Sequence, residues 1–271
     1  MRPPPDAQRL HLRPGALDHA PMGLSVTILT CNEERDLPRC LASVAELADQ
    51  LLVIDSGSTD ATLELARKAG AEIVEHPWTG FVGQRQIALD HATQDWVLCL
   101  DADEWLDGEL AAALARVLAG ADQGHAGFEL NRRSRYLGGW IDHCGWSPEW
   151  RLRLLRRGAG RSGGVEPHDH MEVTGSTGRL AGRLLHEPYV DLAEHLSKIN
   201  AYTTTIAERR VAAGKRVGFG KLLLGPPFRF ARMYLLQRGV LDGWRGLVVC
   251  ALGSWYAFLK DAKTREAHAR N

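Results

Sequence analysis

The feature that most constrains the fold is a regular alternation of strand-like and helix-like segments between residues 24 and 118. The strand-like runs are short, continuous and rich in Val, Ile and Leu, which is typical of strands buried on both faces of a parallel sheet. A strand–helix order repeated in this way predicts an α/β fold, a mostly parallel sheet flanked by helices, with right-handed crossovers. The predicted strands are 24–30, 51–54, 71–75 and 96–100, and helices are predicted to end near 48, 70, 92 and 118.

Polar clusters follow three of these strands, at Thr30–Glu33, Asp55–Asp60 and Asp101–Glu104. Parallel α/β sheets bind ligands beyond the carboxyl ends of their strands, so these clusters predict one ligand site. Neither a GxxxxGK[ST] loop nor a GxGxxG fingerprint follows the first strand. The sequence therefore gives little support to a P-loop or to a dinucleotide site.

The third cluster contains two aspartates, Asp101 and Asp103, at a spacing of two. If the chain stays extended, both carboxylates point the same way. At about 4 Å and an effective dielectric near 20 they would repel by roughly 4 kcal/mol, so a positive partner is expected. Mg²⁺ or Mn²⁺ with phosphate oxygens as further ligands fits, because such ions take few protein carboxylates. A solvated acidic turn is the alternative interpretation.

Two other side chains suit a nucleotide diphosphate at this edge of the sheet. Asp55 can accept a hydrogen bond from a base N–H or a ribose hydroxyl, beside a turn whose glycine lets the backbone approach a ligand. Arg85 lies on the helix before the 96–100 strand and can contact the same ligand. A solvated helix face is an equally good interpretation of Arg85.

Composition excludes several other classes of protein. The formal net charge is zero, so no overall field indicates a nucleic-acid partner. The five cysteines are scattered and contain no CxxC pair, which favours reduced thiols in a cytoplasmic protein. Residues 1–22 are rich in Pro, Arg and His and lack the apolar core of a signal peptide, so we interpret them as a disordered tail.

Four segments together resemble glycosyltransferase family two: LSVTILTCNEERDLPRCLASV, LLVIDSGSTDATLELARKAGAEIV, WTGFVGQRQIALDHA and DWVLCLDADEWL. Within that family the chain is similar to the lipopolysaccharide-core glucosyltransferase type, from about Leu24 to beyond Lys260. The resemblance implies a GT-A fold, with a catalytic domain at 23–190. It also implies an inverting, metal-dependent transfer of a sugar, glucose being expected, from a UDP-sugar to an inner-core or other lipid-linked glycan.

The resemblance also implies roles for individual residues. One departure from the family is Gln86, where asparagine is common. By position, the resemblance assigns Thr30, Asn32, Glu33 and Asp55 to the uridine pocket, Arg85 and Asp101 to the donor, and Asp101 with Asp103 to the metal-binding DxD pair.

A second chemically dense stretch, Glu166–Glu172, contains the candidate base. An inverting transfer needs a group that removes the proton of the attacking acceptor hydroxyl. The family usually has Val-His-Glu here and this chain has Pro-His-Asp, so Asp169 is the predicted base and Glu166 the reserve. A zinc site formed by His168, His170 and His186 is a weaker alternative, because the set lacks cysteine or helical spacing.

The chain after residue 118 changes character. Two further strands are expected at 127–136 and 151–157. The second is expected to have one buried and one solvated, Arg-rich face, and a phosphate-binding role for that basic face is the alternative. The segment Trp140–Trp146 between them suits either a sugar-stacking platform or the core.

Residues 191–271 are expected to form an amphipathic helical extension, with a helix from Asp191 to Gly214 and later helices broken at Pro226-Pro227 and Gly239. No apolar run there reaches the ~18 residues of a spanning helix. Its Arg, Lys and aromatic residues suit peripheral contact with the cytoplasmic face of the inner membrane. The alternative is packing against the catalytic domain or against a second subunit, in a homo-oligomer.

Two other functions remain open on the sequence alone. A sugar-nucleotide pyrophosphorylase shares the expected fold, but its Gly- and Arg-rich phosphate loop near the first strand is absent. A non-catalytic nucleotide-sugar-binding module descended from the enzyme would keep the donor site. Release of UDP in the presence of acceptor separates the enzyme from the binding module.

Overall fold

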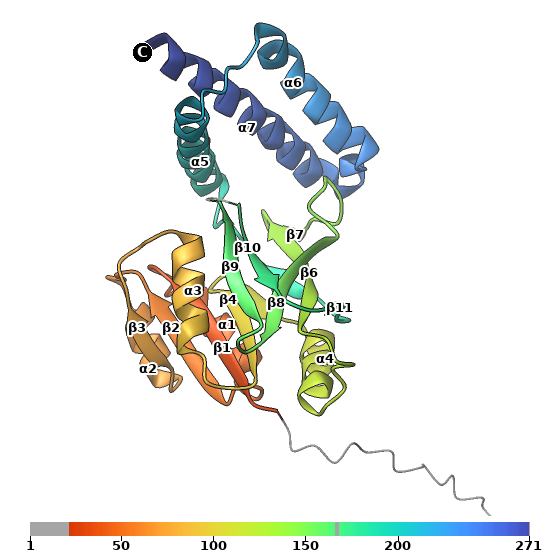
Figure 1. The fold of residues 1–271 in the computed structure, drawn as a ribbon. Coiled ribbons are helices and arrows are strands. Elements are labelled where there is room, and N and C mark those ends of the chain that lie inside the picture. The colour runs from red at the N-terminus through yellow and green to blue at the C-terminus, as the bar shows by residue number, and fades with distance from the viewer. Residues whose placement is uncertain (1–21, 166–167, 271) are drawn as a thin grey trace, which may run out of the picture.

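The structure is a computed structural model that describes residues 22–165 and 168–270. The predicted tail, except Met22, and the reserve base Glu166 therefore lie outside the described residues. The described part forms a sheet with helices on both faces and a separate layer of three helices above it (Figure 1).

The first half of the chain forms the predicted parallel sheet. Its strands lie in the order β3-β2-β1-β4, each paired in parallel with its neighbour. All seven residues of β1 are buried, as its continuous apolar sequence predicts. These strands are β1 (Leu24–Thr30), β2 (Gln50–Asp55), β3 (Glu72–Glu75) and β4 (Trp96–Asp101).

Helices cover both faces of this sheet. The helices α1, α2 and α4 pack on one face in the main hydrophobic core, while α3 packs on the other against Leu29 and Ile54. The side chain of Asp107 accepts a hydrogen bond from the Leu110 amide and caps α4. The helices are α1 (Leu37–Val44), α2 (Thr62–Lys68), α3 (Phe81–His91) and α4 (Gly108–Leu118).

The sheet continues beyond β4 with mixed pairing, in which β8 is antiparallel to β4 and β6 while β11 and β12 are parallel to β6. The order from β4 is β4-β8-β6-β12-β5, with β7 and β11 paired to β6, and β9 and β10 form a separate hairpin. This hairpin lies beside α3 and brings Asp169 to the carboxyl ends of the parallel strands. The strands are β5 (Glu104–Leu106), β6 (Gly127–Tyr136), β7 (Gly139–Trp140), β8 (Glu149–Arg156), β9 (Gly160–Val165), β10 (His168–Val173), β11 (Thr177–Arg179) and β12 (Leu184–His186).

The C-terminal helices form the upper layer in Figure 1. Asp191 caps α5 and Gly214 follows its end with a positive φ, as predicted. The break predicted at Pro226-Pro227 is wrong, because α6 runs through both prolines. The elements are α5 (Leu192–Ala212), α6 (Phe219–Ala231), a π-helical turn η1 (Arg232–Leu236), a 3₁₀ turn η2 (Gly239–Asp242) and α7 (Gly243–Arg270). None of the helices in the described ranges is long and apolar enough to cross a bilayer.

Candidate functional site

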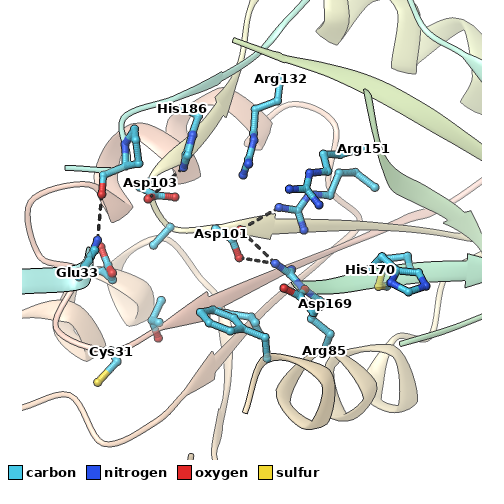
Figure 2. A pocket seen from close by; sticks show the side chains of 18 of the residues that line it. Cys31, Glu33, Arg85, Asp101, Asp103, Arg132, Arg151, Asp169, His170 and His186 are labelled. Atoms are coloured by element: carbon cyan, nitrogen blue, oxygen red, sulfur yellow. Dashed lines mark hydrogen bonds and ion pairs between the residues drawn. The ribbon is translucent and has the colours of Figure 1, made fainter. Parts of the chain in front are cut away.

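A cleft of about 650 Å³ lies at the carboxyl ends of β1 and β4, where the sequence predicts a ligand site. The strands β8 and β10 contribute side chains to its walls (Figure 2). The helical layer closes it with Lys198 and Tyr202 of α5 and Tyr256 of α7. Sequence reasoning missed these three, because their place depends on how the helices pack over the sheet.

Asp101 ends β4 and lies in a cluster of arginines. Its Oδ1 accepts from Arg85 Nη2 at 2.8 Å, and its Oδ2 accepts from Arg153 Nη2 at 2.8 Å. Burial alone would raise the pKa of Asp101, but the charges of Arg85 and Arg153 outweigh it and hold that pKa well below its usual range. Asp101 is therefore ionised at neutral pH, with arginine as the positive partner that the sequence requires.

Asp103 follows after a turn rather than along an extended strand, yet it lines the same cleft. One carboxylate oxygen, Oδ2, lies 3.4 Å from His186 Nε2, while Oδ1 is buried and has no hydrogen-bond partner among the described residues. Burial opposes the ionised form, and interaction with His186 lowers the pKa of Asp103 below its usual value. A buried, ionised oxygen without a partner is costly unless a ligand satisfies it.

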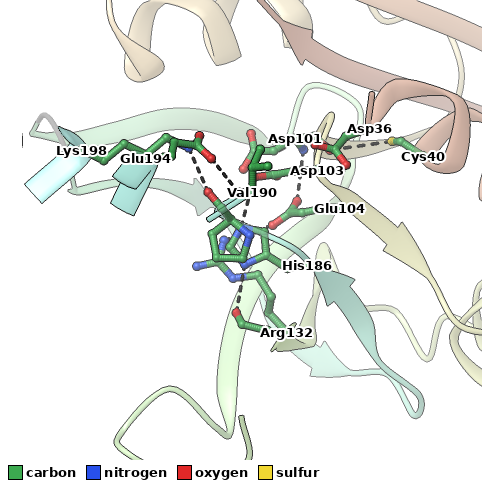
Figure 3. Close-up of polar contacts among 12 residues, drawn as sticks. Asp36, Cys40, Asp101, Asp103, Glu104, Arg132, His186, Val190, Glu194 and Lys198 are labelled. Carbon is green, nitrogen blue, oxygen red and sulfur yellow. Dashed lines mark hydrogen bonds and ion pairs between the residues drawn. The ribbon is translucent and has the colours of Figure 1, made fainter. Parts of the chain in front are cut away.

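Asp103 and His186 fit a divalent cation. The other ring nitrogen of His186, Nδ1, lies 3.0 Å from Ser134 Oγ, which orients Nε2 toward Asp103. Figure 3 draws His186 together with Asp103 and Glu104. Carboxylate oxygen and imidazole nitrogen are both common ligands of Mn²⁺ and related ions. Within residues 22–165 and 168–270 no group of three or more His, Cys, Asp or Glu forms a complete cage. Further ligands would have to come from a bound substrate.

Arg85 connects the two sides of the cleft. Its Nε donates to Asp169 Oδ2 at 2.6 Å, while its Nη2 donates to Asp101. Only 3% of its side chain is exposed, so the interpretation as a solvated helix face is wrong. The neighbouring Gln86 accepts from the Ser162 amide at 3.0 Å and so fastens α3 to the β9–β10 hairpin that holds Asp169.

The residues assigned to the uridine pocket divide into two groups. Thr30 and Glu33 line the cleft, with Glu33 at the side of Asp103. Burial, followed by the charges of Asp103 and Asp36, raises the pKa of Glu33 to about 7. Its carboxyl group is therefore partly protonated at neutral pH and can donate as well as accept a hydrogen bond.

Asp55 and Asn32 instead shape the loops behind the cleft wall. Asp55 accepts from Thr30 Oγ1 at 2.8 Å and from the amides of Gly57 and Ser58, and these bonds outweigh burial and lower its pKa. Asn32 has a left-handed backbone (φ 58°), and its Oδ1 accepts from the Thr59 amide at 2.8 Å. The loops after β1 and β2 are thus tied to each other.

Arg153 was not predicted as a site residue. The expectation of a solvated Arg-rich face on β8 is wrong at this position, because Arg153 is buried and donates to Asp101 and Glu104. The alternation of Arg with Leu in 151–157 does carry the signal, since it puts Arg151 and Arg153 on one face. The sequence alone does not show that this face meets β4 at the cleft.

The remaining predicted features are the segment Trp140–Trp146 and the histidines of the zinc alternative. The structure favours the core interpretation of the segment, because Trp140 packs near Trp105 and Trp146 packs against Tyr136. His170 and His186 both line the cleft. His170 Nε2 lies 3.3 Å from Glu172 Oε1, and His186 belongs with Asp103. Among the side chains that the structure describes, no group of three or more His, Cys, Asp or Glu could hold a metal ion, and the side chain of His168, the third member of the zinc alternative, lies outside that set.

Glu104 supports residues that line the cleft. It is fully buried, accepts from Arg153 Nη2 at 2.9 Å and from Arg132 Nη1 at 3.1 Å, and accepts from the Asp101 amide at 3.1 Å. Its role is to neutralise two arginines and to fix the turn between Asp101 and Asp103.

Glu104→Gln is therefore expected to destabilise the fold by about 3–5 kcal/mol, because it leaves buried arginine charge without its partner. Thermal and urea unfolding measure this change. Glu64→Gln is the matched control, because Glu64 pairs with Lys68 on an exposed helix face and its loss is expected to leave the midpoint unchanged. Equal midpoints for the two variants would contradict the role given to Glu104.

The chain is similar to several known proteins. Residues 25–166 match the model of the family described as Glycosyl transferase family 2. The lipopolysaccharide core biosynthesis glycosyltransferase LpsC of Rhizobium meliloti is 37% identical over 91% of this chain and 93% of its own length. An uncharacterized glycosyltransferase of Rickettsia typhi is 27% identical over 90% of this chain and 87% of its own. The mannosyltransferase PcManGT of Pyrobaculum calidifontis, solved with GDP-Man and Mn²⁺, covers 92% of this chain and 90% of its own, with a TM-score of 0.52 and 15% identity.

Proposed function

The chain belongs to glycosyl transferase family 2 and is a glycosyltransferase with the GT-A fold, and from this premise we propose which sugar transfer it carries out. The proposed reaction is inverting transfer of a sugar, with glucose expected, from a UDP-sugar to the lipopolysaccharide inner core or to another lipid-linked glycan. The observation that carries the proposal is the convergence of Asp101, Asp103, Arg85 and Asp169 in one cleft, in a chain 37% identical to LpsC.

The proposed donor site is the end of the cleft nearest β1 and β4. Thr30 and Glu33 would contact the uridine, and Arg85 would contact the donor from α3. Asp103 and His186 would hold Mg²⁺ or Mn²⁺, with Asp101 beside them. Such an ion stabilises the negative charge of a departing diphosphate.

The proposed base is Asp169, on the β10 side of the cleft. The acceptor oxygen would bond to the anomeric carbon on the face opposite the diphosphate, while the bond from that carbon to the diphosphate oxygen breaks. The electron pair leaves with UDP, and the hydroxyl proton passes to the Asp169 carboxylate. Arg85 positions Asp169 and Asp101 at the same time, because it donates to both.

UDP release tests the proposed function. The full chain is supplied with UDP-glucose or another UDP-sugar, Mn²⁺, and core oligosaccharide from cells that lack this protein. Acceptor-dependent UDP release and a mass increase of one hexose support the proposal. UDP binding without acceptor-dependent release would indicate the non-catalytic binding module instead.

We further propose that the segment 219–247 contacts the cytoplasmic face of the inner membrane. All 13 residues of α6 are at least partly exposed, although the helix is rich in Leu and Phe. Large apolar side chains on α6, η1, η2 and the start of α7 face solvent, with exposures of 56–78% at Phe219, Leu223, Leu224, Phe228, Leu235, Leu236, Leu241 and Trp244. An exposed apolar surface of this kind indicates an interaction site.

The charge of this segment favours an anionic lipid surface over a second protein subunit. It contains five basic residues and one acidic residue, Asp242, which accepts from the backbone and ring of His143. Apolar and basic residues mixed on exposed helices are typical of an interfacial membrane site.

Phe228→Ser with Leu235→Ser is expected to weaken binding to vesicles of phosphatidylcholine and phosphatidylglycerol by about tenfold or more. The reason is that two exposed apolar side chains, which would insert into the lipid, are lost. Co-sedimentation measures binding, and Leu192→Ser on α5 is the control at another exposed leucine. The contrary outcome is a wild-type chain that does not bind these vesicles but forms a dimer. If the double variant is then monomeric, the segment is instead the interface of a homo-oligomer.

A further inference from the structure

A second hollow, of about 340 Å³, lies between the C-terminal half of α5 and the middle of α7. Four basic residues line it, Arg209, Arg210 and Lys215 from α5 and its end and Lys260 from α7, together with Tyr256 and Ile206. The described residues that line it include none that is acidic. Such a concentration of positive charge in a concave site suits an anion.

One acidic residue, Asp261, contacts the lining of the hollow. Asp261 is buried and accepts from Arg210 Nη1 at 2.6 Å, so it neutralises Arg210 from behind the lining. Burial lowers the pKa of Lys260, and the charges of Arg210 and Arg229 lower it further. Cations from α5 and α6 therefore raise the free energy of the charged lysine, and a bound anion would relieve that cost.

The hollow adjoins the catalytic cleft. Tyr256 lines both. On α5, Lys198 and Tyr202 line the cleft, while Ile206 and Arg210 line the hollow. These four residues recur every fourth position, so they form one stripe along the helix. From Tyr202, which lines the cleft, to Arg210, which lines the hollow, the helix rises about 12 Å. A group bound in the hollow therefore lies too far from the cleft to take part in the bond changes there.

We propose that this hollow binds a phosphate or carboxylate group carried by the acceptor, at a distance from the hydroxyl that accepts the sugar. Arg210, Lys215 and Lys260 contribute part of the positive charge of the hollow. This charge would hold the acceptor where α5 and α7 meet. The assignment of the anion to an acceptor rests on the proposed transfer function. The binding of an anion to the hollow is independent of that function.

Protection of Lys260 from acylation tests the site directly. The full chain is treated with an acylating reagent in the presence and absence of inorganic phosphate, and modified peptides are quantified by mass spectrometry. Phosphate is expected to slow the labelling of Lys260 about tenfold, corresponding to one charge-assisted contact. Labelling of Lys68, which pairs with Glu64 on an exposed helix, is expected to stay unchanged. Equal rates at Lys260 with and without phosphate would overturn the site.

Transfer kinetics test what carries the anion. Lys260→Met with Lys215→Gln is expected to raise the KM for a phosphorylated core acceptor about 10- to 100-fold, while kcat and the KM for the UDP-sugar stay unchanged. Treatment of the acceptor with phosphatase and lyase, to remove its acidic groups, is expected to abolish the difference from wild type. Lys68→Met is the matched control. A KM that the double variant does not raise would overturn the acceptor assignment.

Two further outcomes separate the alternatives. Protection of Lys260 by phosphatidic acid vesicles, but not by the soluble phosphorylated acceptor, would overturn the acceptor assignment in favour of a lipid headgroup. A chain that transfers no sugar to any acceptor, yet shows phosphate protection of Lys260, would overturn the proposed function and leave the anion site standing.

Discussion

Asp103→Ala is expected to abolish metal-dependent binding of UDP and to lower sugar transfer by about 10³-fold, the scale of losing one strong stabiliser of developing charge. Asp103 Oδ1 is buried and unpartnered among the described residues, and His186 lies at 3.4 Å from Oδ2. The substitution removes the carboxylate of the ligand pair that we propose for the metal, Asp103 and His186. Calorimetry with UDP, with and without Mn²⁺, measures the binding.

Two control variants separate the effect of the Asp103 charge on UDP binding from the effect of its side-chain volume. Asp103→Asn keeps the side-chain volume and the hydrogen-bond acceptor but loses the charge, so it is expected to behave like the alanine variant. Glu109→Ala, at an exposed acidic residue on α4, is expected to bind UDP as the wild type does. UDP binding in the presence of Mn²⁺ that is unchanged in Asp103→Ala would exclude Asp103 as a metal ligand.

The parallel half of the fold and the position of the cleft could be predicted from the sequence. Apolar runs fix the strands, and the geometry of parallel strands brings the residues that follow them to one edge. Thr30, Glu33, Asp101 and Asp103 all lie in the cleft for this reason. Each of these predictions needed only local pattern and one rule of topology.

The contacts that sequence reasoning missed come from the later strands and the helical layer. Arg153 reaches Asp101 because β8 pairs with β4 in antiparallel orientation, and His186 reaches Asp103 because β12 lies between β6 and β5. The strand register that sets both contacts joins segments about 50 to 80 residues apart and has no local signature in the sequence. Tyr256 lies further still from the sheet along the chain, and only helix packing places it at the cleft.

Asp169→Asn is expected to keep UDP-sugar binding and to lower transfer by about 10²- to 10⁴-fold, the range of general-base catalysis. The amide keeps the size of the side chain but cannot take the proton of the acceptor hydroxyl. Arg85 retains its bonds to Asp101, so the donor side of the cleft stays in place. A fall in kcat with little change in the KM for the UDP-sugar measures this role.

Two further variants decide whether Asp169 or Glu166 is the base. Asp169→Glu restores the residue that the family usually has at this position, so it is expected to retain most of the transfer activity, whereas a purely structural partner of Arg85 would tolerate Asp169→Asn as well. Glu166→Gln is expected to transfer at the wild-type rate. Full transfer in Asp169→Asn would exclude Asp169 as the base, and loss of transfer in Glu166→Gln at the same time would give the role to Glu166. The two carboxylates are separated by Pro167 and His168, so one segment of the chain supplies the base in either case.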